Sequence, residues 1–180
     1  MKKALLVAVA TSLFFFAACG NNNGTTTEGK ENKESKEQKE EVKAPDNFTQ
    51  YDGPHFTMSY PNGMHSTFNS DETINYSNED GSLKFDASFS GGGTQKKQLK
   101  EAGDNYVYMK QQQGAEVISA PVVKDNIMTV RLLEKGKINN FFVVSGKGSH
   151  SVSGSVVYPE DKASVFDAYV APIVASIKVK

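Results

Sequence analysis

The sequence predicts an α+β fold: a mainly antiparallel sheet of about six to seven strands covered by two helices, as an α/β/α sandwich. Three observations lead to this prediction. Short runs of alternating apolar and polar residues recur between turn-forming residues, as expected of strands with one buried face. Two stretches, after Thr94 and after Pro159, instead repeat apolar residues at a helical spacing. Residues 141–144 are an unbroken apolar run, so this strand should be buried on both faces and need a cover on each.

The folded sequence should begin near Phe48 with strand-like segments. The run from His55 to Tyr60 ends at Pro61-Asn62-Gly63, where proline presets φ and Asn-Gly tolerates a positive φ, which favours a turn. A hairpin is predicted next, with arms at residues 72–77 and 82–90 joined through Asn78-Glu79-Asp80-Gly81. The apolar residues of its second arm share one face and set the register: Leu83, Phe85, Ala87 and Phe89.

A helix is predicted after the glycine run 91–93, with Thr94 as its cap and Gly114 at its end. Its inward stripe should be Leu99, Ala102, Tyr106 and Met109. Three glycines before a helix are also compatible with a phosphate cradle, because free amides at a helix N-terminus bind anions. The spacing matches neither common phosphate-binding motif, so we interpret the glycines as a flexible connection.

Four more strands are predicted in the second half, at residues 116–124, 127–134, 138–145 and 151–158. Pro121 lies in the first of them and indicates an edge strand or a bulge, because proline cannot donate to a strand ladder.

The last predicted helix starts at Pro159-Glu160-Asp161, where a proline and two acids are favourable at the positive end of the helix dipole. Its apolar stripe is Ala163, Phe166, Val170, Ile173 and Ile177. Pro172 should kink or shorten this helix, and residues 176–180 are expected to form an irregular tail.

The N-terminal segment is typical of a secretory signal. Lys2 and Lys3 precede an apolar run, residues 4–16, that is too short to cross a hydrocarbon core of about 30 Å. Its end, Ala17-Ala18-Cys19-Gly20, resembles the lipobox of bacterial lipoproteins, although Phe16 stands where that motif has an aliphatic residue.

The resemblance to the lipobox implies a signal peptide at residues 1–18 and a lipid on the sulfur of Cys19. Two acyl chains on this cysteine would anchor the chain stably in a membrane. The alternative is ordinary cleavage that leaves a free thiol; a single cysteine at this position favours lipidation. The expected location is therefore the cell envelope, on a periplasmic or an outer surface.

Residues 19–47 are predicted to be a disordered, charged linker, and residues 48–180 a single α+β domain. Between Asn21 and Pro45 there is no aromatic residue, and Val42 is the one branched aliphatic residue, so burial cannot offset the entropy of ordering. Lysine-glutamate pairs recur here. A flexible tether with an end-to-end distance of about 25–30 Å is favoured over a fluctuating charged helix.

The domain resembles the PsbP-like group, named for the extrinsic subunit of photosystem II, whose fold is shared by a Ran-binding nuclear import factor. The resemblance depends on three features. They are Phe56-Thr57-Met58-Ser59-Tyr60-Pro61, the helix before a long meander, and Phe166-Asp167-Ala168-Tyr169 followed by Pro172, Ile173 and the Ser176-Ile177 ending. It implies a sheet covered by helices on both sides and a binding or assembly subunit rather than an enzyme. It implies no site residues.

No motif predicts catalysis, a metal site or a cofactor. His55, His65 and His150 are isolated in the sequence, and Ser153-Gly154-Ser155 lies inside a strand pattern rather than in a nucleophile elbow. The net charge of -1, without a basic stripe, argues against nucleic acid as a partner.

The leading functional prediction is therefore a membrane-anchored, non-enzymatic lipoprotein that binds a protein partner or assists an assembly in the envelope. The alternative is a lipoprotein that binds a small molecule or ion in a pocket between sheet and helix, lined by Tyr106, Tyr158 and Phe166. An envelope hydrolase is the third hypothesis.

Overall fold

The computed structural model describes residues 46–180. The predicted signal peptide (1–18), Cys19 and the predicted linker up to residue 45 lie outside the described residues.

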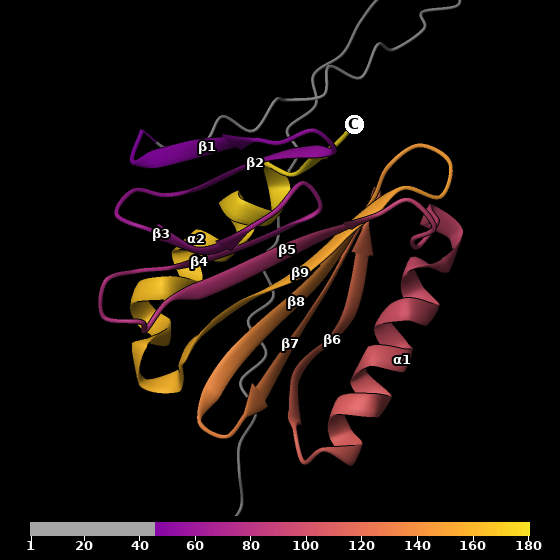
Figure 1. The fold of residues 1–180 in the computed structure, drawn as a ribbon. Helices are drawn as coiled ribbons and strands as arrows, with labels where there is room; N and C mark the ends of the chain where they lie inside the picture. Colours follow the sequence, from indigo (N-terminus) through magenta and orange to yellow (C-terminus); the bar gives the residue numbers. More distant parts are fainter. Residues whose placement is uncertain (1–45) are drawn as a thin grey trace, which may run out of the picture. The chain divides into compact units, whose positions relative to one another are not determined.

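The structure consists of ten strands and two helices among these residues (Figure 1). The strands are β1 Phe48–Asp52, β2 Phe56–Pro61, β3 His65–Asn69, β4 Thr73–Ser77, β5 Lys84–Ser90, β6 Glu116–Lys124, β7 Ile127–Glu134, β8 Lys137–Ser145, β9 Ser151–Pro159 and β10 Lys178–Val179. The helices are α1 Leu99–Gln112 and α2 Ala163–Ala175, each preceded by a short 3-10 turn, η1 Lys96–Gln98 and η2 Glu160–Lys162.

Seven strands form one antiparallel sheet in the order β3-β4-β5-β9-β8-β7-β6, which confirms the predicted fold class. A second sheet, β1-β2-β10, was not expected from the sequence. Its last strand corrects the prediction of an irregular tail, because Lys178 pairs with Thr57 and the backbone N–H of Lys180 donates to the carbonyl of His55 over 2.8 Å. The edge of β2 opposite β1 supplies the backbone hydrogen-bond partners that residues 178–180 need to form a strand.

The large sheet has an apolar core on each face. Phe142 and Val144 of β8 belong to the larger core, under α2 and the small sheet, whereas Val143 belongs to the smaller core with Leu99 of α1. This alternation confirms that β8 is buried on both faces. Figure 1 shows α1 along β6 and β7, with α2 on the other side of the sheet.

Helix α1 differs from its prediction in two places. Thr94 does not cap it, because the helical turns start after Gln95, whose N–H is bonded to the side chain of Gln98. Met109, predicted to face inward, is 47% exposed. Gly103 is buried instead, and a Cβ there would lie 2.6 Å from the Cβ of Pro121. The helix thus approaches β6 most closely through a glycine that the apolar pattern does not mark.

Two proline residues lie inside regular elements, one in strand β6 and one in helix α2. Pro121 lies in β6, which is an edge strand with two register shifts, as the sequence predicts. Pro172 lies inside α2, and the helix continues past it to Ala175. There Ser176 accepts a hydrogen bond from the backbone N–H of Ser59 over 2.7 Å, which fastens the end of α2 to β2.

Candidate functional site: the groove between α2 and β7

An open groove of about 790 Å³ lies between α2 and the neighbouring strands β6, β7 and β8. It exists because α1 covers the other face of β6 and β7, while α2 packs over β8, β9 and the small sheet. The face of β7 that carries Ile127, Thr129 and Arg131 is therefore left without a helix. We refer to this space as the α2–β7 groove.

The walls of the α2–β7 groove are mostly apolar. Helix α2 contributes Val170, Ala171, Val174 and Ala175, and β6 contributes Val122, which is 55% exposed. Phe142 of β8 lies in the floor and is fully buried. An exposed valine facing a stripe of small apolar residues is a surface that can bury more area when a ligand is present.

Four polar side chains form a connected chain at one end of the groove. Arg131 Nη1 donates to Asp167 Oδ2 over 3.1 Å, and Arg131 Nη2 lies 3.0 Å from Oδ1. Tyr158 Oη donates to Asp167 Oδ1 over 2.5 Å, and Asn140 Nδ2 donates to Tyr158 Oη over 2.9 Å. Side chains from β7, β8, β9 and α2 thus converge on one carboxylate.

The electrostatics of this chain of side chains follow from its contacts. Burial disfavours ionisation of Asp167, but hydrogen bonds from Tyr158 and Arg131 outweigh it and hold the pKa of this carboxyl below its ordinary value. Burial, together with the hydrogen bond to Asp167, raises the pKa of Tyr158 to about 12. Near neutral pH Asp167 is therefore a paired carboxylate in the groove lining, and Tyr158, which is fully buried and outside the lining, is a protonated phenol.

Arg131 also has an N–H group without a hydrogen-bond partner among the described residues. This group is the buried Nε.

The ionisable groups of this arrangement are engaged with one another. The carboxylate of Asp167 is neutralised by Arg131, and the phenol of Tyr158 is a donor to it, so neither is a free general base. Within the described part of the chain, no three His, Cys, Asp or Glu side chains gather as metal ligands, and no helix is long and apolar enough to span a membrane.

The structure brings together two of the three residues predicted to line a pocket. The rings of Tyr158 and Phe166 pack 5.7 Å apart in the larger core. Tyr106 lies on the opposite face of the sheet, where it stacks on Phe141 at 3.8 Å and accepts a hydrogen bond from Asn139 over 3.2 Å. The three side chains therefore do not share one pocket, and none of them is among the residues lining the α2–β7 groove.

Sequence reasoning missed Arg131, Asn140 and Asp167 as members of a site. The sequence did carry a signal that two of them belong to a polar site. Arg131 is the chain's one arginine and lies in a strand beside buried residues. Asn140 interrupts an apolar face of β8. An arginine there requires a partner of opposite charge. Its identity as Asp167 required the tertiary structure.

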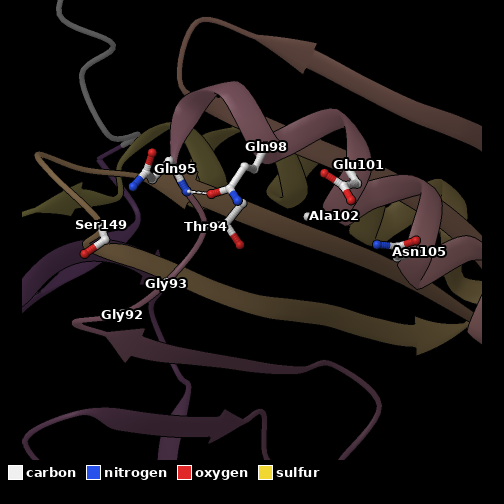
Figure 2. Close-up of a pocket in the computed structure, with 9 residues that line it drawn as sticks. All are labelled: Gly92, Gly93, Thr94, Gln95, Gln98, Glu101, Ala102, Asn105 and Ser149. Carbon is white, nitrogen blue, oxygen red and sulfur yellow. Dashed lines mark hydrogen bonds between the residues drawn. The ribbon is translucent and has the colours of Figure 1, made fainter.

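A second, more polar hollow of about 610 Å³ lies at the start of α1 (Figure 2). It is lined by Gly92, Gly93, Thr94, Gln95, Gln98, Glu101, Ala102, Asn105 and Ser149. Two of the amides near this helix start are engaged, because Thr94 N–H donates to Ser151 Oγ over 3.1 Å and Gln95 N–H donates to Gln98 Oε1 over 3.3 Å. The carboxylate of Glu101 further disfavours an anion.

The packing of the glycines before α1 favours their interpretation as a connection between β5 and α1 over their interpretation as a phosphate-binding loop. A Cβ on Gly93 would lie 1.9 Å from Ser151 Oγ, so this glycine allows the loop to approach β9. Gly91 and Gly92 have open space around them.

The histidines occupy separate environments. His55 stacks on Phe89 at a ring separation of 4.4 Å, and His150 meets the same ring edge-on at 5.4 Å. His65 lies in the exposed edge strand β3.

The fold is similar to that of two solved proteins. The Ran-binding protein Mog1p of Saccharomyces cerevisiae matches with a TM-score of 0.55 and 14% identity over 74% of this chain and 95% of that chain. The cyanobacterial PsbP protein of Synechocystis matches with a TM-score of 0.52 and 13% identity over 74% of this chain and 93% of that chain. The likeness shows the fold alone and confirms the predicted PsbP-like architecture. No protein-family profile and no curated protein matches the sequence.

Proposed function

We propose that this chain is a lipid-anchored, non-enzymatic binding protein of the bacterial cell envelope that holds a protein partner at the α2–β7 groove. The observation that carries the binding part is the groove itself: an apolar surface with convergent polar groups at one end and no free catalytic base among them.

The anchoring part rests on the N-terminal sequence. A lipid on Cys19 would hold the chain at a membrane, and residues 19–47 would hold the domain at a distance from the lipid surface.

The fold similarity supports a binding role by analogy. The neighbour from Saccharomyces cerevisiae is described as a Ran-binding protein, so this fold is compatible with recognition of another protein. We transfer neither its partner nor its binding surface to this chain.

The second candidate function is the binding of a small molecule. It is favoured by the groove volume of about 790 Å³, which falls in the range of about 300–1,000 Å³ found for ligand pockets. Native mass spectrometry of protein extracted from membranes distinguishes the two candidates, because a bound small molecule adds a discrete mass to the folded protein.

The anchor is tested by intact-mass spectrometry of the full chain expressed in a bacterial host that processes lipoproteins. We expect a mature form that starts at Cys19, carries a diacylglyceryl group and sediments with membranes. The Cys19→Ala variant should lack the lipid mass. A wild-type protein with an unmodified Cys19 thiol would refute the anchor.

A further inference from the structure

We infer that the α2–β7 groove receives an amphipathic α-helix of a protein partner, which lies alongside α2. This inference rests on the proposed binding function and specifies the structural class of the partner segment.

The length and width of the groove match a short piece of helix. The lining residues of α2 extend from Asp167 to Ala175, about 12 Å at ~1.5 Å per residue, and those of β7 from Ile127 to Arg131, about 13 Å at ~3.3 Å per residue. β6 and β8, the strands on either side of β7, lie about 10 Å apart. This width is close to the diameter of a helix, ~10–12 Å. The space therefore holds about two helical turns.

Helix α2 presents a face suited to a neighbouring helix. Its groove residues follow the spacing i, i+3, i+4, i+7, i+8 from Asp167, so they form one stripe beside the buried stripe. Ala171 and Ala175 lie one turn apart on this stripe, and both are exposed. Small side chains at this spacing allow two helix axes to approach within about 8–10 Å.

The floor of the groove over β7 does not offer the backbone groups that an added strand would need. An added strand needs unpaired backbone groups at a sheet edge, but β7 is paired with β6 on one side and with β8 on the other. The groove lies over the face of this pairing. A helix satisfies its own backbone hydrogen bonds and needs only side-chain contacts, so it can bind there.

The charged residues of the groove lie at its two ends, which suits a helix whose middle is uncharged. Charged lining residues lie at the ends of the groove: Arg131 with Asp167 at one end, and Lys124 next to Asp125 at the other. Each end contains both signs, so an isolated anion or cation gains little net attraction. Between them the surface accepts apolar side chains spaced i, i+3 or i+4, and i+7.

A photo-crosslinking experiment on the full, membrane-bound chain tests this inference. The probe is p-benzoylphenylalanine placed at Val122 in the groove or, as a matched control, at Val165. Both valines are exposed to a similar degree, 55% and 58%, but Val165 does not line the groove. The crosslinked partner peptide is sequenced by mass spectrometry and then synthesised.

The expected result is a crosslink from position 122, and not from 165, to a peptide with apolar residues at i, i+3 or i+4, and i+7. The synthetic peptide should gain helical circular dichroism on binding the purified protein. V122R should weaken this binding by at least tenfold, whereas V165R should change it less than twofold.

Other results overturn the inference in distinguishable ways. Crosslinks from 165 alone, or to a segment that stays non-helical when bound, refute the helix in the groove but leave a protein-binding function. Absence of protein crosslinks from both positions, with a small molecule retained in native mass spectrometry, refutes the protein-binding function itself.

Discussion

Tyr158 on β9 donates a hydrogen bond of 2.5 Å to Asp167 on α2, and this contact joins the sheet to the helix that forms one wall of the groove. The same carboxylate is held by Arg131 of β7. The groove therefore keeps its shape through one carboxylate shared by a tyrosine and an arginine.

Removal of this contact should destabilise the domain. We expect Tyr158→Phe to lower the free energy of unfolding by about 1–2 kcal/mol, because the buried amide of Asn140 loses an acceptor and the partly exposed carboxylate of Asp167 loses a donor. Urea denaturation measures the change. Tyr108→Phe is the control, since Tyr108 is 67% exposed and this variant should shift stability by less than about 0.5 kcal/mol.

A double-mutant cycle that combines Tyr158→Phe with Asp167→Asn should give a coupling free energy of about 0.5–3 kcal/mol. Additive effects of the two substitutions would contradict the contact.

Acid should remove the contribution of Asp167. The pKa of this carboxyl is lower in the folded state than in the unfolded chain, where it is about 3.9, so the folded state binds fewer protons. The contribution is complete above the unfolded pKa and disappears as pH falls through the folded pKa. The stability difference between wild type and Asp167→Asn should therefore be constant near neutral pH and shrink below about pH 4. Urea titrations at a series of pH values test this, and a difference that grows with acidity would contradict it.

The pairing of β5 with β9 should depend on Gly154. A Cβ at this position would lie 1.9 Å from the backbone oxygen of Asp86, which cannot move without breaking the ladder. We expect Gly154→Ala to cost about 3 kcal/mol or to prevent accumulation of folded protein. Gly92→Ala is the matched control, because nothing lies within 4 Å of its added Cβ. Equal thermal stability of the two variants would show that the strands separate more easily than this packing implies.

The C-terminal strand should contribute to stability although it is short. Deleting residues 178–180 removes the pairing of β10 with β2 and the bonds of Lys180 Nζ to Asp52 Oδ1 (2.7 Å) and to the carbonyl of Gly53 (2.6 Å). We expect a loss of about 1–3 kcal/mol in urea denaturation, mainly from backbone hydrogen bonds. Lys180→Ala alone should cost less than about 1 kcal/mol, because exposed ion pairs are weak. A deletion without effect would mean that β10 does not stabilise the small sheet.

Much of the large sheet could be predicted because most of its strands carry a local pattern. The second arm of the first hairpin shows this: Leu83, Phe85 and Ala87 alternate with polar residues, and all three are buried. Strand β3 and strand β10 have no such pattern. Phe68 in β3 is 52% exposed, and β10 has two residues whose partner strand, β2, is distant in the sequence.

The candidate site was less predictable than the fold. The aromatic residues chosen from the sequence, Tyr106, Tyr158 and Phe166, are large enough to line a pocket, yet they pack against other rings on two faces of the sheet. The groove is instead formed where the α2 side of β6 and β7 has no helix. This follows from the placement of the two helices on opposite faces, which no local pattern encodes.

The sequence by itself determined the α+β class, the double burial of residues 141–144 and the edge position of the strand with Pro121, whereas the lipid attachment at Cys19 stays a prediction. These follow from periodicity, backbone restriction and a short motif, all of which act over a few residues. Only the tertiary structure decided that Arg131, Tyr158 and Asp167 meet at one end of an open groove. Their meeting depends on how β7, β9 and α2 pack, because hydrogen bonds of about 3 Å between distant residues form only after the chain has folded.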